Sequence, residues 1–180
     1  MSAKDTRALI RRIRDGIPGV ALRTNFIVGF PGETEADFEE LCAYVEEEAF
    51  DHVVVFPYER EPETPSHGMA DQVPIARRRS RRSRLLALQQ RVSRERLRRR
   101  VGEVAWVMVD GPAHAGRGSE GAWAARTTGQ SYEVDGGVLL EGEDLAPGRI
   151  VRARVTGASA YDLFARLEAT AALHVVGGPR

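Results

Sequence analysis

The chain has 180 residues, 42% of them hydrophobic, and 26 basic against 26 acidic side chains, so it can bury one large or two small cores and carries no net charge. Its one cysteine, Cys42, excludes a disulfide framework, and the four histidines lack metal-ligand spacing, so we expect no metal site. No apolar run approaches the roughly 20 residues that span a bilayer and no signal-peptide pattern is present, so we expect a cytoplasmic protein without a membrane partner.

The first sixty residues alternate between helical and strand patterns. Apolar residues at helical spacing predict a helix over residues 2–14, which ends near Gly16 and Pro18, and another over 35–48. Short continuous apolar runs predict strands at 26–28 and 53–56. This order indicates an α/β architecture with a parallel sheet. Because two strands alone do not make a stable sheet of this kind, we expect further elements upstream.

A glycine-rich turn, Gly-Phe-Pro-Gly-Glu-Thr at 29–34, joins the first strand to the second helix. Thr34 is expected to cap that helix, with Asp37 as its capping-box partner. A strand followed by a glycine turn and a helix N-terminus is typical of the rim of a small-molecule site. An ordinary βα turn has the same pattern, and spacing alone leaves both interpretations open.

Charge is uneven along the chain despite the zero total. Residues 33–51 hold nine acids and no base, whereas residues 75–100 hold twelve arginines and one acid. The arginines fall in a predicted helix over 74–100 with a narrow apolar stripe of Leu85, Leu88 and Val92, after an irregular, proline-rich connection at 57–74. They are expected to form a solvated helix face, to bind phosphates or an acidic partner, or to pair with the acidic helix.

The texture changes after residue 100. Five short β-rich runs, separated by Gly, Asp and Pro turns, predict a small antiparallel barrel of OB-like type with strands at 104–109, 121–126, 138–140, 150–156 and 161–164. An Ala-rich and Gly-Gly-Pro tail at 169–180 is expected to be flexible.

Several motifs together resemble the C-terminal third of the radical-SAM methylthiotransferases. They are the segment 22–38, the strand at 50–58 with its Glu-Arg and Thr-Pro continuation, and Asp-Gln-Val-Pro at 71–74 before the Arg-rich helix. The closing barrel resembles the TRAM domain of that family. The resemblance implies the C-terminal part of a partial (β/α) barrel at 1–73, a linking helix at 74–100, a TRAM barrel at 101–168 and a tail at 169–180.

The barrel sequence indicates a branch of this family. The Glu-Val-Asp-Gly run at 133–136 and Arg126-Thr127 resemble the RimO branch, which modifies an aspartate of a small-subunit ribosomal protein, although Ser131 and Tyr132 replace its usual Ala-Pro. Residues 101–168 hold six bases and ten acids, which favours a basic protein partner over tRNA, although an acidic surface can serve solubility alone. We take Arg126, Glu133 and Asp135 as candidate partner-binding residues.

The resemblance also implies cofactors. The intact family uses S-adenosylmethionine and two [4Fe–4S] clusters held by cysteines, and a chain with one cysteine lacks those ligands. We therefore expect the cluster ligands on a missing N-terminal part, no catalytic residue here, and no activity from this chain alone. By resemblance Arg23, Gly29, Pro31, Gly32 and Glu33 form a wall of the S-adenosylmethionine pocket.

The physical case for this wall is that a cation and free turn amides can hold a ligand's carboxylate and ribose. The alternative for Arg23 is an ion pair. Glu59 and Arg60 follow the next strand, where barrel loops gather at a site.

Two other functions stay open from the sequence. The tRNA-modifying branch of the family is kept open by the Arg-rich helix. A stand-alone TRAM-type RNA-binding module is the other alternative, and the lack of a basic, aromatic stacking face on the predicted strands argues against it.

Overall fold

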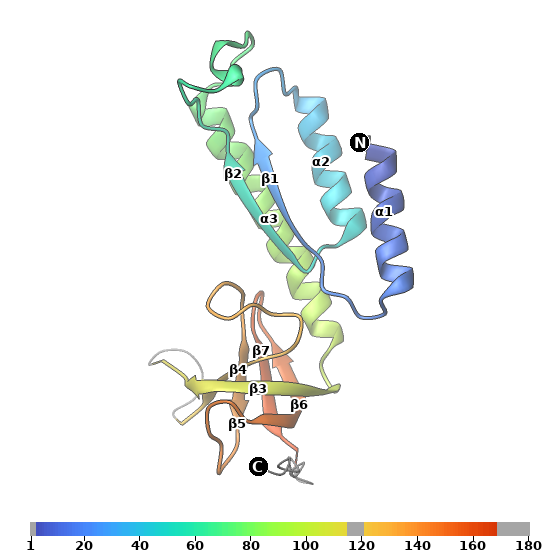
Figure 1. Cartoon of the computed structure of the whole chain (residues 1–180), viewed down its shortest axis with the longest axis vertical. Coiled ribbons are helices and arrows are strands. Elements are labelled where there is room, and N and C mark those ends of the chain that lie inside the picture. Colours follow the sequence, from blue (N-terminus) through green and yellow to red (C-terminus); the bar gives the residue numbers. More distant parts are fainter. Residues whose placement is uncertain (1–2, 115–120, 169–180) are drawn as a thin grey trace, which may run out of the picture. The chain divides into compact units, whose positions relative to one another are not determined.

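The computed structural model describes residues 3–114 and 121–168, and it divides the chain into two compact units, Met1–Arg96 and Leu97–Arg180 (Figure 1). The first unit is mixed α/β and the second is a closed five-stranded barrel, each with its own hydrophobic cluster. The fold class predicted from the sequence is therefore confirmed. The expected flexible tail at 169–180 lies outside the described residues.

The first unit is built on two parallel strands. Strands β1 (Arg23–Val28) and β2 (His52–Pro57) pair in register over their whole length, from Arg23 opposite His52 to Val28 opposite Pro57. Both strands are longer than the apolar runs that predicted them. The helices of this unit are α1 (Ala3–Gly16), α2 (Glu35–Glu48) and most of α3 (Ile75–Arg99), and a short 3₁₀ turn, η1 (Pro65–Gly68), lies in the irregular connection.

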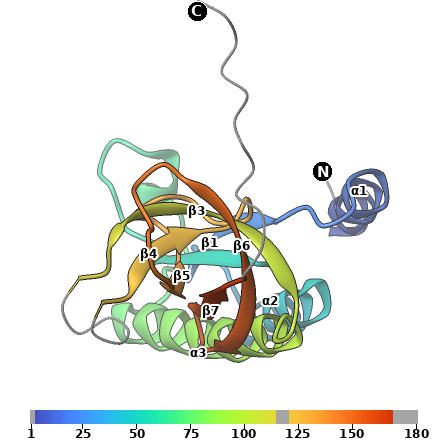
Figure 2. The same ribbon diagram turned by 90° about the horizontal axis from the view of Figure 1, so that it is seen from below.

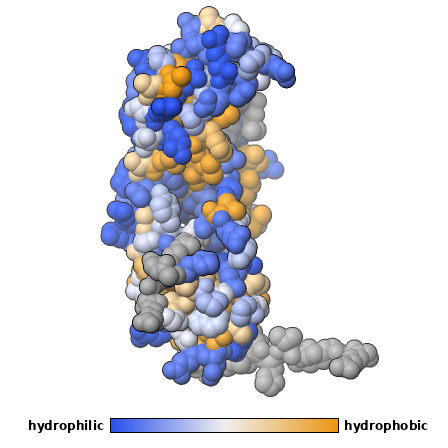
Figure 3. Space-filling view, turned by 90° about the vertical axis from the view of Figure 1, so that its left-hand side faces the viewer, coloured by the Kyte–Doolittle hydropathy of each residue, from blue (hydrophilic) through white to orange (hydrophobic). Residues whose placement is uncertain are grey.

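Among the described residues of this unit, helices cover one face of the sheet. Helices α2 and α3 pack on it through a cluster of Val28, Phe38, Val45, Val55 and Leu85. Side chains alternate along a strand, so the neighbours of the buried Val28 and Val55 point to the other face of the sheet. On that face Ile27 and Phe56 are more than half exposed. Figure 3 shows hydrophobic residues gathered on the surface of the first unit. The sheet thus has a covered face and an open face.

The start of α2 follows the predicted capping box. The Thr34 hydroxyl accepts a hydrogen bond from the Asp37 amide at 3.2 Å, and the Asp37 carboxylate accepts one from the Thr34 amide at 2.8 Å. Two of the unsatisfied donors at the helix start are thereby paired. This capping fixes where the glycine turn ends and the helix begins.

Helix α3 confirms the predicted Arg-rich helix, but its buried face is not purely apolar. Leu85 and Val92 are buried as expected. Nearer to the N-terminus of the helix, the same face carries Arg78 and Arg81, which are also buried. Leu88 is only partly buried. Within the described ranges, this helix and the others are too short or too polar to cross a bilayer.

The second unit is a barrel with strand order β3-β4-β5-β7-β6, closed by pairing of β3 with β6 (Figure 2). Its strands are β3 (Val104–Pro112), β4 (Trp123–Arg126), β5 (Val138–Glu141), β6 (Ile150–Ala158) and β7 (Leu163–Leu167). The antiparallel barrel expected from the sequence is wrong in one pairing, because β5 and β7 are parallel. A closed ring of five strands cannot alternate direction throughout, so at least one pair must be parallel.

The last strand begins later than the sequence predicted. Tyr161 and Asp162, expected to open it, instead form a tight turn in which the Ser159 hydroxyl accepts hydrogen bonds from both of their amides, at 3.1 and 2.9 Å. Strand β7 therefore starts at Leu163 and continues to Leu167. A serine two or three residues before a turn competes with strand pairing in this way.

Because the two units have separate cores, a core mutation should affect one unit. We expect Leu85→Ala to lower the stability of the first unit by about 2–5 kcal/mol, since Leu85 is fully buried there. Both tryptophans, Trp106 and Trp123, lie in the barrel. Urea unfolding followed by far-UV circular dichroism should show the loss, while the tryptophan fluorescence transition stays within about 0.5 kcal/mol. In the matched control, Leu163→Ala, the tryptophan fluorescence transition of the barrel should move and the stability of the first unit should stay unchanged. If either variant moved the unfolding transitions of both units equally, the cores would not be separate.

Candidate functional site

The carboxyl edge of the two-stranded sheet brings two loops together. The turn after β1 and the segment after β2 are joined by a hydrogen bond from the Tyr58 amide to the Val28 carbonyl at 2.8 Å. The rings of Phe30 and Tyr58 meet edge-on with centroids 5.2 Å apart. Ligand sites in open parallel sheets lie at this edge of the strands. The candidate site is therefore the rim formed by these two loops.

A hollow of about 500 Å³ lies at this rim, on the open face of the sheet. Its apolar wall includes Ile27 and Phe56, which are register partners on the two strands, together with Phe30. Polar groups are supplied by Glu59, Thr64 and Ser66. An apolar wall with a few polar groups suits a small organic ligand.

Three amides of the turn are already paired within the protein, whereas the sequence led us to expect free turn amides. The Gly29 amide donates to the Glu33 carboxylate at 2.9 Å, the Gly32 amide to the Asp71 carbonyl at 3.0 Å, and the Glu33 amide to the Phe30 carbonyl at 3.0 Å. The turn closes on itself because Glu33 stands four residues after Gly29 and can reach its amide. These donors therefore hold the shape of the turn and are not available to an anion.

Arg81 fixes this turn from helix α3. Only 1% of Arg81 is exposed, and its guanidinium donates to the Glu33 carboxylate at 2.5 Å and to the Glu33 carbonyl at 3.1 Å. The same group also reaches Glu35 at 3.1 Å and lies over the Phe38 ring. A buried guanidinium with a carboxylate and a carbonyl as acceptors is held in one geometry.

Arg78 fixes both loops at once. Its guanidinium donates to the carbonyls of Val73 and Tyr58 at 2.6 and 2.9 Å and stacks over the Tyr58 ring. Its aliphatic stem lies against Gly29, where an added Cβ would fall 2.5 Å from the Arg78 Cγ. Gly29 is thus a glycine because α3 approaches it and because its φ is +77°. We call Arg78 and Arg81 the arginine clamp.

Several other arginines of α3 pair with the acidic residues of the same unit. Arg84 bonds Glu35 and Glu39, Arg91 lies 2.8 Å from Glu46, and Arg96 lies 2.7 Å from Asp51. The bonds from Arg84 and then Arg81 hold the pKa of Glu35 below its usual value. Of the three interpretations of the Arg-rich helix, pairing within the chain is the one that these contacts support.

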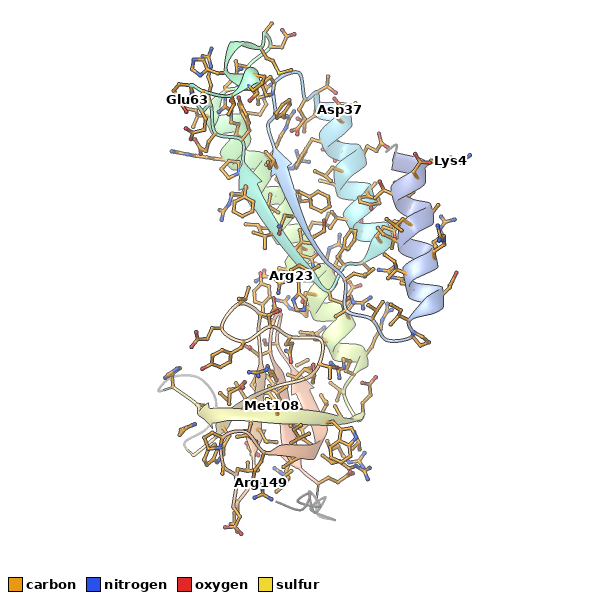
Figure 4. All side chains as sticks on the ribbon, viewed as in Figure 1. Lys4, Arg23, Asp37, Glu63, Met108 and Arg149 are labelled. Atoms are coloured by element: carbon orange, nitrogen blue, oxygen red, sulfur yellow. The ribbon has the colours of Figure 1, made fainter. Side chains whose placement is uncertain are left out.

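Arg23 does not join the turn. It is the first residue of β1, whereas the turn follows the last, and a strand of six residues separates them by roughly 17 Å. Figure 4 shows Arg23 at the opposite end of β1 from Asp37, which stands at the start of α2. Arg23 alternates onto the same open face as Ile27. The expected combination of this cation with the turn amides is therefore not formed.

The candidate partner-binding residues lie on the barrel, and they differ in their contacts with it. Arg126 pairs with Asp110 and lies over the Tyr132 ring, and Asp135 accepts a hydrogen bond from the Ser131 amide at 2.8 Å. These two predicted partner-binding residues therefore stabilise the barrel's own loop. Glu133 is exposed and has a left-handed backbone with φ +58°.

One face of the barrel differs from the sequence expectation. Trp106 on β3 is 45% exposed and stands opposite Arg152 on β6, with Arg154 and Arg166 alongside. The expectation that the strands lack a basic, aromatic face is therefore wrong. Glu168 pairs with Arg152 and Arg154, and Glu141 pairs with Arg166, so much of this positive charge is neutralised within the barrel.

The sequence missed the residues that shape the first site. In the sequence Arg78 and Arg81 belong to a charged run, and their spacing of three places them on one helix face with Leu85. The exposure of Ile27 and Phe56 on the open face was predictable from the alternation of side chains along a strand, because each residue adjoins a buried valine.

No iron–sulfur ligand set is found among the described residues. Residues 3–114 and 121–168 contain no group of three or more His, Cys, Asp or Glu side chains that could hold a metal ion. Burial, followed by the nearby charge of Glu39, raises the pKa of the Cys42 thiol and disfavours the thiolate that a cluster needs. The part of the chain that the structure describes therefore does not fit a cluster.

The model of the TRAM domain family matches residues 101–167, so the second unit is similar to a TRAM domain. Over about nine-tenths of its length the chain is also similar to proteins named "Ribosomal protein uS12 methylthiotransferase RimO". The identity is 45% over 163 residues with that of Anaeromyxobacter sp. (strain K), and 46% over 166 residues with that of Syntrophobacter fumaroxidans. These matches cover 91% and 92% of this chain but 34% and 37% of the relatives.

The chain is therefore related to the RimO methylthiotransferases and fits their C-terminal region, which confirms the family resemblance read from the motifs. It spans about a third of the length of the curated relatives that it matches.

The arginine clamp predicts that substitutions of two arginines of α3 differ greatly in their effect on stability. We expect Arg81→Met to destabilise the first unit by about 3–5 kcal/mol, because it leaves the Glu33 carboxylate without its charge partner. Arg84→Met, the control, removes exposed ion pairs and should cost at most about 1 kcal/mol. Urea unfolding by circular dichroism measures both. Adding Glu33→Met to Arg81→Met should recover part of the loss, and equal losses from the two arginines would contradict the clamp.

The two glycines of the turn give a second comparison. Both have positive φ, but a Cβ at Gly32 meets nothing within 4 Å, whereas one at Gly29 collides with Arg78. We expect Gly32→Ala to cost about 1–2 kcal/mol from the backbone alone. Gly29→Ala should cost at least about 1 kcal/mol more in the same unfolding measurement, because of the collision. Equal costs would show that α3 does not constrain Gly29.

Proposed function

We propose that this chain is part of a methylthiotransferase that adds a methylthio group to an aspartate of ribosomal protein uS12. The observation that carries the proposal is the sequence identity of 42–46%, over about nine-tenths of the chain, with relatives named as uS12 methylthiotransferases. The whole activity belongs to a longer protein, since the chain spans about a third of those relatives. The proposal places the chain in the cytoplasm with its ribosomal substrate.

In this proposal the first unit supplies one wall of an S-adenosylmethionine site. The rim at 29–33, which includes Gly29, Pro31, Gly32 and Glu33, would border the ligand, and Ile27, Phe30 and Phe56 would cover it from water. Arg23, further down the open face, is a more distant candidate. When bound, S-adenosylmethionine supplies the methyl group and the carbon radical of the family's chemistry.

The iron–sulfur clusters would be held elsewhere in the longer protein. The single cysteine of the chain and the high thiol pKa of Cys42 support this division. The role of this chain is then to bind, orient and shield, with the arginine clamp holding the rim in place.

The TRAM barrel would recruit the substrate protein. Residues 101–168 carry ten acids and six bases, and this charge suits a basic protein. RNA binding by the barrel is the second candidate, because Trp106 and the arginines of β6 and β7 form a basic, aromatic face. The acids paired with those arginines weigh against it.

A chimeric enzyme tests the proposal. This chain would replace the matching third of the Anaeromyxobacter relative, whose remaining sequence would supply the clusters. We expect the reconstituted chimera to modify uS12 and not tRNA, as measured by mass spectrometry of both. Ile27→Asp should weaken S-adenosylmethionine binding about tenfold or more, because it places a charge in the apolar wall.

Ile17→Asp is the matched control, since Ile17 is similarly exposed in the same unit but does not line the hollow, and its affinity should be unchanged. Equal affinity of the Ile27→Asp variant and the parent would overturn the pocket assignment. Modification of tRNA in place of uS12 would favour the tRNA branch.

A further inference from the structure

The loop that carries the Glu-Val-Asp-Gly run is held at both ends. At its start the Asp135 carboxylate accepts from the Ser131 amide at 2.8 Å, and the Arg126 guanidinium lies over the Tyr132 ring. At its end the Gly137 amide donates to the Asp162 carboxylate at 2.9 Å. Gly136 packs so closely that an added Cβ would lie 1.9 Å from the Tyr161 carbonyl oxygen. The ends of the loop therefore have one conformation.

The tip of this loop points two large apolar side chains into solvent. Tyr132 is 56% exposed, and Val134 is 68% exposed, the highest value among the large hydrophobic residues that the structure describes. Between them Glu133 adopts a left-handed backbone, which costs a non-glycine residue about 1–2 kcal/mol. Exposed apolar groups on a strained but fixed loop do not stabilise the barrel. They are typical of a surface that is covered by a partner.

The charges around the tip indicate which kind of partner. Glu133, Asp110 and Asp135 lie on or beside the loop, and Arg126 is paired with Asp110. The charge of Glu133 and then its hydrogen bond raise the pKa of Tyr132, so the phenol stays neutral. A phosphate backbone is repelled by such a site, whereas a lysine or arginine beside an apolar side chain fits it.

We propose that Tyr132, Glu133 and Val134 form the docking tip through which the barrel contacts a basic segment of its substrate protein. This rests on the proposed function, and it names the residues that perform the recruitment. Arg126, Asp135 and Gly136 hold the tip and do not contact the partner. Tyr132 and Val134 supply the apolar contact, and Glu133 selects a cationic neighbour.

The test uses the full chain and the proposed ribosomal substrate protein in a titration by calorimetry, with tRNA in a parallel titration. We expect the double variant Tyr132→Ser and Val134→Ser to bind the substrate protein about tenfold or more weakly. Because both side chains are exposed, the tryptophan fluorescence unfolding transition should not move. Glu133→Lys should slow association and remove part of its dependence on salt.

Ile150→Ser is the matched control, since Ile150 is a similarly exposed apolar residue on strand β6 of the same barrel. Its affinity should equal that of the parent. If the parent binds and the double variant binds equally well, or if the control loses as much, the docking tip is wrong while recruitment by the barrel stands. If the parent binds tRNA and not the protein, the recruitment proposal fails and the docking tip fails with it.

Discussion

The burial of Arg81 against Glu33 is the interaction on which the first unit depends. It joins α3 to a turn 48 residues earlier in the chain, and it places a guanidinium and a carboxylate where little water reaches them. Taking two charges out of water is expensive, and the attraction between them and their further hydrogen bonds offset part of this cost, although the buried Nε of Arg81 has no partner among the described residues. Here Glu33 also accepts from the Gly29 amide, so the shape of the turn and the position of the helix are set together. The rim of the candidate site is a consequence of that pairing.

Similar ion pairs balance the uneven charge of this chain locally. The acidic helix and the Arg-rich helix lie in one unit, and their side chains meet in exposed pairs around the buried one. Exposed pairs contribute little each, but they remove the repulsion that nine acids or twelve arginines would otherwise cause. Arginine is suited to both positions, because the stem of Arg78 packs against Gly29 and the planar head of Arg81 lies over the Phe38 ring, while both heads reach several acceptors.

Local features of the fold were predictable from the sequence, and contacts between distant residues were not. Thr34 and Asp37 predict the start of α2, because all the residues of a capping box lie within four positions of the sequence. The sequence also shows glycine at 29, but its reason, the stem of Arg78, is 49 positions away. In the barrel, Asp135 reads as a surface acid, and only the structure shows that it closes its own loop. The strand count alone predicts that a closed barrel has at least one parallel pair, since five is odd, but only the structure shows that this pair is β5 with β7.

The place of β7 in the barrel has a consequence for synthesis. This strand is the last one in the part of the chain that the structure describes, yet it lies between β5 and β6 in the ring. Until Leu163–Leu167 leaves the ribosome, both neighbours present unpaired edges, and β3 must wait for β6 before it can pair on that side. A chain stopped before this strand would expose two open edges, which are templates for aggregation. The ring therefore closes only after β7 has been made, whereas the helices and the strand pairs that do not involve β7 can already be in place.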